Sequence, residues 1–410
     1  MRAARGLDSG MLSDRPFRDL NSSQPSVHVA AGQGGYANIR AALNGFDLSA
    51  ARGKKVLLKP NAGRMAAAGS GIVTGPEAVA AAADAFLEAG AEVAVGESPI
   101  LGVRTMDAFE QCGIAAVARE RKLTLIDLDA RPFVPVPVPG GRAIGELRVC
   151  PEIMEYDFVI SLPVMKMHMH TGVTLSVKNM KGCLWRRSKV DLHMLPPVEG
   201  SADKSLDIAI ADMSGVLRPH LAVIDGYIGM EGLGPSAGTP RKLDAAVVSA
   251  DPFAADAVAC RLMGLSAREV PHLRIGAERG YGLIDLDRMS ISPDNWMDYA
   301  SPFERPPRDL ALEFPGITIL DRNSCSSCQS TLLLFLRRYG EKIFDYFPKE
   351  LQPVIAIGKG HDEVPRGTLC LGNCTARHRS QGIFVPGCPP VASAIFKAIG
   401  GDADREDDEV

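Results

Sequence analysis

The sequence predicts an α/β protein in two parts: a mostly parallel sheet domain with helices on both faces, and a smaller C-terminal α/β unit that carries clustered cysteines. Two observations predict this class. From residue 56 onward, short apolar segments alternate with longer Ala-rich or amphipathic segments, which is the rhythm of βαβ units. The rhythm restarts at residue 316, and five of the nine cysteines lie beyond that point. A chain of 410 residues is also too long for one ordinary hydrophobic core.

Composition narrows the class of protein further. Hydrophobic residues make up 46% and charged residues 23% of the chain, and both values are typical of globular proteins. The net charge of −4 argues against a protein that coats nucleic acid. No run of about 18 apolar residues predicts a membrane span, and the polar N-terminal segment lacks the apolar core of a secretory signal. We therefore expect a cytoplasmic protein, and a homo-oligomer is an open alternative.

The pattern divides the chain into five segments. Residues 1–24 form a polar lead-in, residues 25–270 the main domain with an active cleft, and residues 271–310 a connection. Residues 311–401 form the cysteine-rich unit, and residues 402–410 an acidic tail. In the main domain we expect strands at residues 27–31, 56–58, 92–98, 123–129, 158–162, 221–238 and 245–250, helices at 76–90, 106–121, 205–217 and from 252, and a hairpin at 132–149. In the C-terminal unit we expect strands at 316–321, 353–360, 368–372 and 382–387, and helices at 326–347 and 389–400.

A polar stretch, residues 161–182, follows the strand predicted at 158–162. Lys166, His168, His170 and Lys178 crowd into it just past the end of the strand, where open α/β sheets place their ligand sites. The two histidines share one face of an extended segment, so they can point together at a metal, an anion or a proton. Taken alone, such a pair is more typical of a polar surface loop than of a site.

The C-terminal cysteines form the most specific chemical pattern in the sequence. They are Cys325, Cys328, Cys370, Cys374 and Cys388. Each lies where a predicted strand gives way to a helix, so their loops can converge at one end of a small parallel sheet. The spacing C-x2-C, long gap, C-x3-C, thirteen residues, C-P favours a [4Fe–4S] cluster. Zinc is the first alternative and free or disulfide-forming thiols the second. Four thiolates suffice, and we expect Cys325 to be the spare because Cys328 lies further into the helix start.

Five sequence blocks together resemble the domain of unknown function 362 family of iron–sulfur-associated proteins. They are LLKPN, TGPEAV with a later VGES, LPVMKMHMHTGVTLSVKNMKG, LAVIDGYIGMEGLGP and SADPFAADAVA, and they cover residues 56–265. The resemblance implies an α/β fold distantly similar to that of nickel-dependent lactate racemase, and no settled reaction. Family members often carry a ferredoxin-like insertion, whereas this chain has no C-x2-C-x2-C-x3-C-P run. Its PGCPP segment also resembles the cluster-binding end of small respiratory iron–sulfur subunits.

The resemblance brings these blocks to strand ends, in what we expect to be one cleft. The expected substrate-binding residues are Lys59, Asn61, Glu97, Asn179, Asp225 and Asp251. The expected catalytic residues are Lys166, His168, His170, Lys178 and Glu231. The lysines at 166 and 178 would hold a carboxylate or phosphate, and a histidine would move a proton. For Asp251, a role as helix N-cap is an equal alternative.

These observations favour an iron–sulfur oxidoreductase that acts on a small or cofactor-sized anionic substrate, with an electron donor such as a ferredoxin. Two alternatives stay open. A racemase or isomerase would use His168 with His170 or Lys178 as paired bases. A non-catalytic electron carrier or metallocofactor scaffold would use the cluster alone.

Overall fold

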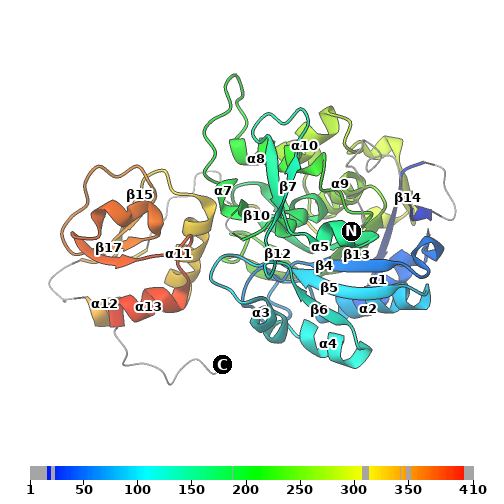
Figure 1. The fold of residues 1–410 in the computed structure, drawn as a ribbon, viewed down its shortest axis with the longest axis horizontal. Helices are drawn as coiled ribbons and strands as arrows, with labels where there is room; N and C mark the ends of the chain where they lie inside the picture. Colours follow the sequence, from blue (N-terminus) through cyan, green and yellow to red (C-terminus); the bar gives the residue numbers. More distant parts are fainter. Residues whose placement is uncertain are drawn as a thin grey trace. The chain divides into compact units, whose positions relative to one another are not determined.

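The computed structural model describes residues 16–19, 24–186, 188–306, 314–341, 343–347 and 352–400. The chain forms two compact units (Figure 1). Unit 1 comprises Met1–Gly232 and Thr239–Arg305, and unit 2 comprises Leu233–Gly238 and Pro306–Val410. Most of the predicted lead-in and all of the predicted acidic tail lie outside the described residues.

The core of unit 1 is a mostly parallel sheet, which confirms the predicted fold class. Its strands follow the order β14-β2-β13-β12-β9-β4-β5-β6. Their bounds are β2 (Ser26–Ala31), β4 (Lys55–Pro60), β5 (Glu92–Glu97), β6 (Thr124–Asp127), β9 (Phe158–Leu162), β12 (Leu221–Glu231), β13 (Thr239–Ser249) and β14 (Ser290–Ser292). The strands from β12 to β6 are parallel, whereas β13 runs antiparallel to both β12 and β2. The carboxyl ends of β9, β4 and β5 therefore meet at one edge.

Helices cover both faces of this sheet and enclose a separate apolar core on each (Figure 1). One core includes side chains of α1 (Gly35–Leu43), α2 (Pro76–Glu88), α3 (Thr105–Gln111) and α4 (Ile114–Arg121). The other includes side chains of α6 (Ser176–Asn179), α8 (Ser205–Ser214), α9 (Pro252–Leu262) and α10 (Pro271–Glu278). In β4, Val56 and Leu58 join the first core and Leu57 the second, as the two-residue period of a strand requires.

The polar stretch after β9 is folded into the sheet, so its histidine pair does not lie on a polar surface loop. The chain forms β10 (Val164–His168) and β11 (Gly172–Thr174), followed by α6 and the 3-10 turn η3 (Met180–Cys183). Strand β10 pairs antiparallel with β11 and parallel with the distal part of β12. Met165 and Met167 are buried in the core, so Lys166 and His168 project from the opposite face. The alternation in VMKMHMH is the strand signal that predicts this arrangement.

Several smaller elements complete unit 1. The predicted hairpin is present as β7 (Val134–Pro137) and β8 (Glu146–Val149). The single helix expected at 106–121 is instead α3 and α4, because the chain turns at Gly113 with a φ of +80°. The segment expected as a connection contributes α10, η5 (Leu286–Arg288), β14 and η6 (Trp296–Tyr299) to unit 1. The remaining elements are β1 (Arg18–Asp19), β3 (Phe46–Asp47), η2 (Ser49–Ala51), α5 (Glu152–Glu155), α7 (Ser188–Asp191) and η4 (Ala267–Glu269).

Unit 2 is a small parallel α/β fold, as predicted. Its sheet has the order β15 (Thr318–Asp321), β16 (Val354–Ile357), β17 (Thr368–Leu371) and β18 (Gly382–Val385), with every pair parallel. The helical elements are α11 (Ser326–Tyr339), α12 (Ile343–Tyr346), η7 (Asn373–His378) and α13 (Ala392–Gly400). The one helix expected at 326–347 is divided, because α11 ends at the C-cap residue Gly340.

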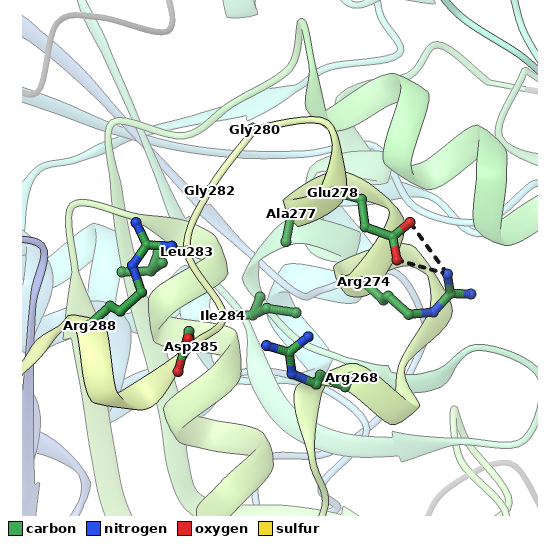
Figure 2. Close-up of a pocket in the computed structure, with 10 residues that line it drawn as sticks. All are labelled: Arg268, Arg274, Ala277, Glu278, Gly280, Gly282, Leu283, Ile284, Asp285 and Arg288. Carbon is green, nitrogen blue, oxygen red and sulfur yellow. Dashed lines mark hydrogen bonds and ion pairs between the residues drawn. The ribbon is translucent and has the colours of Figure 1, made fainter.

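A hollow of about 340 Å³ opens over one continuous segment of unit 1, residues 268–288 (Figure 2). Arg268, Arg274 and Arg288 line it. Arg274 is engaged by Asp203 at 2.7 Å and by Glu278 at 3.3 Å. None of the residues predicted to bind substrate lines this hollow, so it is not the predicted cleft.

The carboxylate of Asp212 joins three parts of unit 1. It is fully buried in α8 and accepts backbone N–H bonds from Arg142, Ala143 and Ile144 at 2.7–3.1 Å. It also forms an ion pair with Arg279, just after α10. One carboxylate therefore ties α8 to the loop after β7 and to the end of α10.

We predict that Asp212→Ala lowers the free energy of unfolding by about 3–5 kcal/mol, because it leaves buried donors and a guanidinium without their partner. Glu110→Ala is the matched control, since Glu110 pairs with Arg119 on the surface and its loss should leave the free energy of unfolding nearly unchanged. Urea denaturation followed by circular dichroism measures both values. Equal losses would contradict the structural role of Asp212.

Candidate functional site

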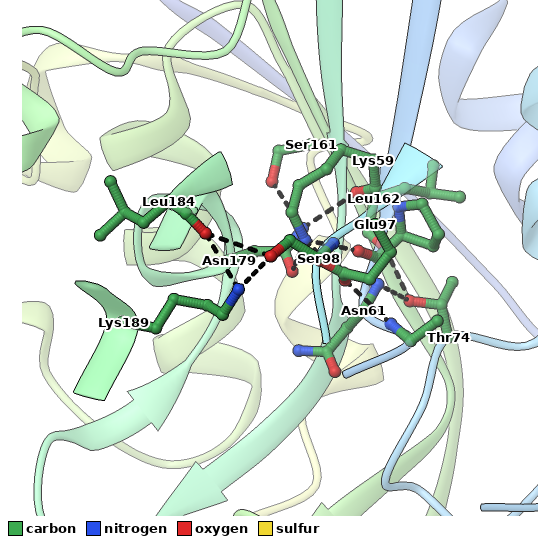
Figure 3. Close-up of polar contacts among 12 residues, drawn as sticks. Lys59, Asn61, Thr74, Glu97, Ser98, Ser161, Leu162, Asn179, Leu184 and Lys189 are labelled. Carbon is green, nitrogen blue, oxygen red and sulfur yellow. Dashed lines mark hydrogen bonds and ion pairs between the residues drawn. The ribbon is translucent and has the colours of Figure 1, made fainter. Parts of the chain in front are cut away.

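A buried ion pair lies where the carboxyl ends of β4 and β5 meet (Figure 3). Lys59 ends in an ammonium 2.8 Å from Glu97 Oε2, 2.8 Å from the Pro60 carbonyl and 3.2 Å from Asn179 Oδ1. Only 1% of the Lys59 surface is exposed. All three N–H groups of the ammonium therefore have an acceptor within the protein.

The side chains that bind Lys59 also form hydrogen bonds with other groups. Glu97 also accepts N–H bonds from Ala62 and Ser98, at 3.1 and 2.8 Å. Asn179 donates to the Lys59 carbonyl at 3.0 Å and to Ser161 Oγ in β9 at 3.1 Å. The predicted substrate-binding residues Lys59, Glu97 and Asn179 are thus together, but they bind one another and hold β4, β5, β9 and α6 in place.

A second buried lysine, which the sequence did not single out, extends this network (Figure 3). Lys189 donates to Ser98 Oγ and, at 2.9 Å, to the Leu184 carbonyl. Its ammonium also lies 3.5 Å from the Asp129 carboxylate, which accepts a bond from Ser98 at 2.7 Å. Lys189 is therefore a paired, structural cation.

Lys166 and Lys178 have a different environment. Lys166, 3% exposed, donates to the Ile72 carbonyl at 2.7 Å and reaches Asn61 Oδ1 at 3.5 Å. Lys178 is half-buried and donates to Thr174 Oγ1 at 3.3 Å. Burial lowers the pKa of Lys178 to about 8, against the opposing charge of Asp207, and it lowers the pKa of Lys166 well below the ordinary value. Both lysines bond to neutral oxygen atoms.

His168 lies on the same face of β10 as Lys166 and is held as a neutral ring. Its Nδ1 accepts the backbone N–H groups of His170 and Thr171, at 3.2 and 3.3 Å. Burial, followed by the charge of Lys178, keeps its pKa well below the usual range. Because Nδ1 is an acceptor, we assign the proton to Nε2, so the ring presents a donor. The rings of His168 and His170 are 6.3 Å apart, so the predicted pair is adjacent.

Three further basic residues, Arg64, Lys181 and His193, surround this group, and the sequence did not predict them as site residues. Burial lowers the pKa of Arg64 to about 10. Lys181 contacts Nε2 of His193, whose pKa is lowered first by burial and then by the charge of Lys181. All three residues are half-buried. We refer to Arg64, Lys166, His168, His170, Lys178, Lys181 and His193 as the basic group.

The predicted acidic residues Asp225, Glu231 and Asp251 make their contacts with residues outside the basic group. Asp251 caps α9 by accepting the Phe253 N–H at 3.0 Å and pairs with Arg218 at 3.2 Å, so the N-cap alternative is the one observed. Asp225 accepts the Gly75 N–H at 2.8 Å, and burial raises its pKa to about 6. Glu231 accepts the backbone N–H of Glu304 at 3.0 Å. These bonds give the three carboxylates structural roles.

Asp256 orients the turn that carries Lys178 and Asn179. Its two carboxylate oxygens accept the N–H groups of Ser176 and Val177 at 2.7 and 3.0 Å, and the Ser176 hydroxyl at 2.6 Å. Burial raises its pKa to about 7. The fully buried Asp256 thus caps α6, which is only one turn long.

In unit 2, the thiol of Cys328 lies near those of three other cysteines. The thiol of Cys328 hydrogen-bonds with Cys325 and lies within electrostatic reach of Cys374 and Cys388. The bond with Cys325, followed by burial, raises the pKa of Cys328. The loops that carry Cys374 and Cys388 are joined by the bond from Asn373 N–H to the Gly387 carbonyl, at 2.9 Å.

Cys370 stands apart from these four thiols. It is fully buried with Ala356 and Val364, on the face of the sheet opposite to Leu369 and Leu371, which pack in the same core as Cys328. The structure therefore separates Cys370, and not Cys325, from Cys328. Among the described residues, no three His, Cys, Asp or Glu side chains are placed to hold a single metal ion.

The fold and the sites define a class of protein: a mostly parallel α/β domain with a basic group at its strand ends, linked to a small thiol-bearing α/β unit. A profile of the family described as "Domain of unknown function (DUF362)" matches residues 56–261, which is half of the chain, and the chain belongs to this family. The thylakoid-associated protein of Synechocystis sp. is 32% identical over 219 residues. That match covers 53% of this chain and 66% of the relative, slightly under two thirds of its length. The family match ends before the cysteines of unit 2.

The described helices include none that is long and apolar enough to cross a membrane.

We predict that Gly182→Ala destabilises unit 1 by about 2–4 kcal/mol, because its Cβ would overlap the Glu97 carboxylate and the Lys59 ammonium. Gly63→Ala is the matched control: its Cβ would meet no atom within 4 Å, and we expect a change within about 1 kcal/mol. Thermal and urea unfolding measure both effects. Equal stability of the two variants would show that the ion pair tolerates displacement.

Proposed function

We propose that this protein is an iron–sulfur oxidoreductase that acts on a small anionic substrate bound by the basic group. The observation that carries the proposal is the grouping of Cys325, Cys328, Cys374 and Cys388 in unit 2. Four thiols that follow parallel strands, with the last in a Cys-Pro sequence, suit the ligand set of a [4Fe–4S] cluster. A bound cluster supplies one-electron transfer.

The surroundings of these thiols fit an anionic cluster. Cys325 is the N-cap of α11, so the positive end of the helix dipole faces the thiols. Gly372 has a φ of +89°, and a Cβ there would lie 3.2 Å from Cys328 Sγ. Glycine therefore both permits the backbone turn and leaves space beside the thiol.

In unit 1, the residues of the basic group would have different roles in binding a substrate. Lys166 and Lys178 would hold its negative charge, and the Nε2–H of His168 would donate a hydrogen bond to it. Lys178, with a pKa of about 8, can give or take a proton near neutral pH. The same proposal includes an external electron donor such as a ferredoxin. It also includes a location in the cytoplasm.

We predict that protein purified without oxygen contains about four irons and four sulfides per chain and absorbs visible light. Cys374→Ser and Cys388→Ser should each remove most of the iron. Cys370→Ser is the matched control and should retain it, because Cys370 lies on the other face of the sheet. Metal analysis, sulfide determination and absorption spectra measure these outcomes. A colourless protein with one zinc and no iron would overturn the proposal.

A second candidate, a racemase or isomerase, is favoured by one observation. The charge of Lys178, whose pKa is about 8, acts on the neutral ring of His168. Two proton-transfer groups of this kind can act on an acidic carbon without electron transfer.

This candidate predicts that a substrate takes up deuterium from D₂O without net oxidation, and that the exchange persists in iron-free Cys388→Ser protein. The exchange rate should rise as pH increases through about 8, because the unprotonated amine of Lys178 is the base. Lys178→Met should lose the exchange. Exchange that disappears together with the iron would exclude this candidate and favour the oxidoreductase.

A further inference from the structure

The ammonium groups of Lys166 and Lys178 approach the same face of the β10–β11 hairpin in unit 1. Lys166 in β10 is paired directly with Thr174 in β11, so their side chains project from one face. Thr174 Oγ1 in turn accepts the bond from Lys178 at 3.3 Å. Thr174 thus shares one face with Lys166 and bonds to Lys178, and the charge of Lys178 acts on Lys166.

These two lysines and Arg64 are not neutralised by the chain. In the described part of the protein, no carboxylate lies within 4.0 Å of the charged nitrogen atoms of Lys166, Lys178 or Arg64. The nearest acidic groups have other partners: Glu97 is bonded to Lys59 at 2.8 Å, and Asp207 lies 3.5 Å from His272.

The three cations also repel one another. The charges of Lys178 and Arg64 both act on Lys166, and that of Arg64 acts on Lys178. Burying charges without opposite charges is costly, and bringing like charges together adds to the cost. The chain meets part of this cost by lowering the pKa of Lys166 and Lys178, and a bound anion would offset it with both groups protonated.

We propose that the basic group binds a dianion, a small molecule with two adjacent negative charges such as a phosphate monoester or a dicarboxylate, and that the protein without it is destabilised by Lys166. This inference deepens the proposed function by naming the substrate class, and it does not depend on the cluster. Lys166 and His168, each 3% exposed, would form the floor of the site. Arg64 and Lys178 are half-buried and would meet the ligand on its solvent side.

The proposal predicts that replacing two buried lysines, Lys166 and Lys189, has different effects on the unfolding temperature. Lys166→Met removes an unneutralised charge, so the ligand-free variant should unfold at the same temperature as the parent protein or a higher one. Lys189→Met is the matched control: it removes the partner of Asp129 and should lower the unfolding temperature.

The experiment is thermal unfolding of the full chain at constant ionic strength with inorganic phosphate, malonate, acetate or chloride. Phosphate or malonate should stabilise the parent protein and Lys189→Met, whereas acetate and chloride should not. The stronger of the two dianions identifies the phosphate or the dicarboxylate class. In Lys166→Met and Lys178→Met the dissociation constant for that dianion should rise by about tenfold or more. Equilibrium dialysis measures it independently of stability, so Lys178→Met still tests the proposal if Lys166→Met does not fold.

The inference is overturned if Lys166→Met lowers the unfolding temperature as Lys189→Met does and keeps the phosphate and malonate responses. It is also overturned if all four anions stabilise equally, since that is an ionic-strength effect. Failure of the proposed function has a different signature. A protein without iron that still binds the dianion refutes the cluster alone, and a protein with iron that ignores dianions refutes this inference alone.

Discussion

The buried ion pair between Lys59 and Glu97 is the constraint on which the strand ends of unit 1 depend. Removing two charges from water is costly, and the pair is tolerable because every polar atom around it is satisfied by a backbone or side-chain partner. In satisfying them, the pair joins β4 to β5 and, through Asn179, to β9 and α6. Four elements that are distant in sequence are held in one arrangement by these contacts.

This constraint also separates structural charges from functional ones. Lys59, Lys166 and Lys189 are all buried lysines of unit 1, and the sequence predicted the first two as site residues without distinguishing their environments. Lys59 and Lys189 have carboxylate partners, and their ammonium groups are fully engaged. Lys166 has only neutral oxygen acceptors. The partners, which only the folded structure brings together, distinguish a residue that holds the fold from one that can hold a ligand.

Much of the fold could be predicted from local patterns. The βαβ rhythm identifies the parallel sheet, and the Asp-Pro pair at 251–252 identifies the start of α9, because N-capping depends on neighbouring residues. Strand β10 was missed because its pairing with β12 joins residues about 60 positions apart, although its two-residue alternation was visible. Gly113 was overlooked as a break because a glycine within a helical pattern is often tolerated.

The site could be predicted in part. The strand-end rule grouped Lys166, His168, His170 and Lys178, whose role as a site stays a prediction. It also grouped Lys59, Glu97 and Asn179, which bind one another in the structure. For the cysteines, the pleat of a strand explains why Cys370 is set apart from the other thiols: it lies between Leu369 and Leu371, so it must face away from them. Arg64 and His193 come from separate segments that no spacing connects to the polar stretch, whereas Lys181 lies within that stretch and was not selected.

One short helix links the structural network to the basic group. Asp256 holds the first two N–H groups of α6, and the adjacent residues Lys178 and Asn179 then point to different neighbours. Asn179 is fixed by Lys59 and Ser161, so the backbone at Lys178 has little freedom to move. The backbone of Lys178 therefore cannot move away from Lys166 to relieve their repulsion. The same contacts that stabilise the strand ends keep two like charges together, and this arrangement prepares the site for an anion before it arrives.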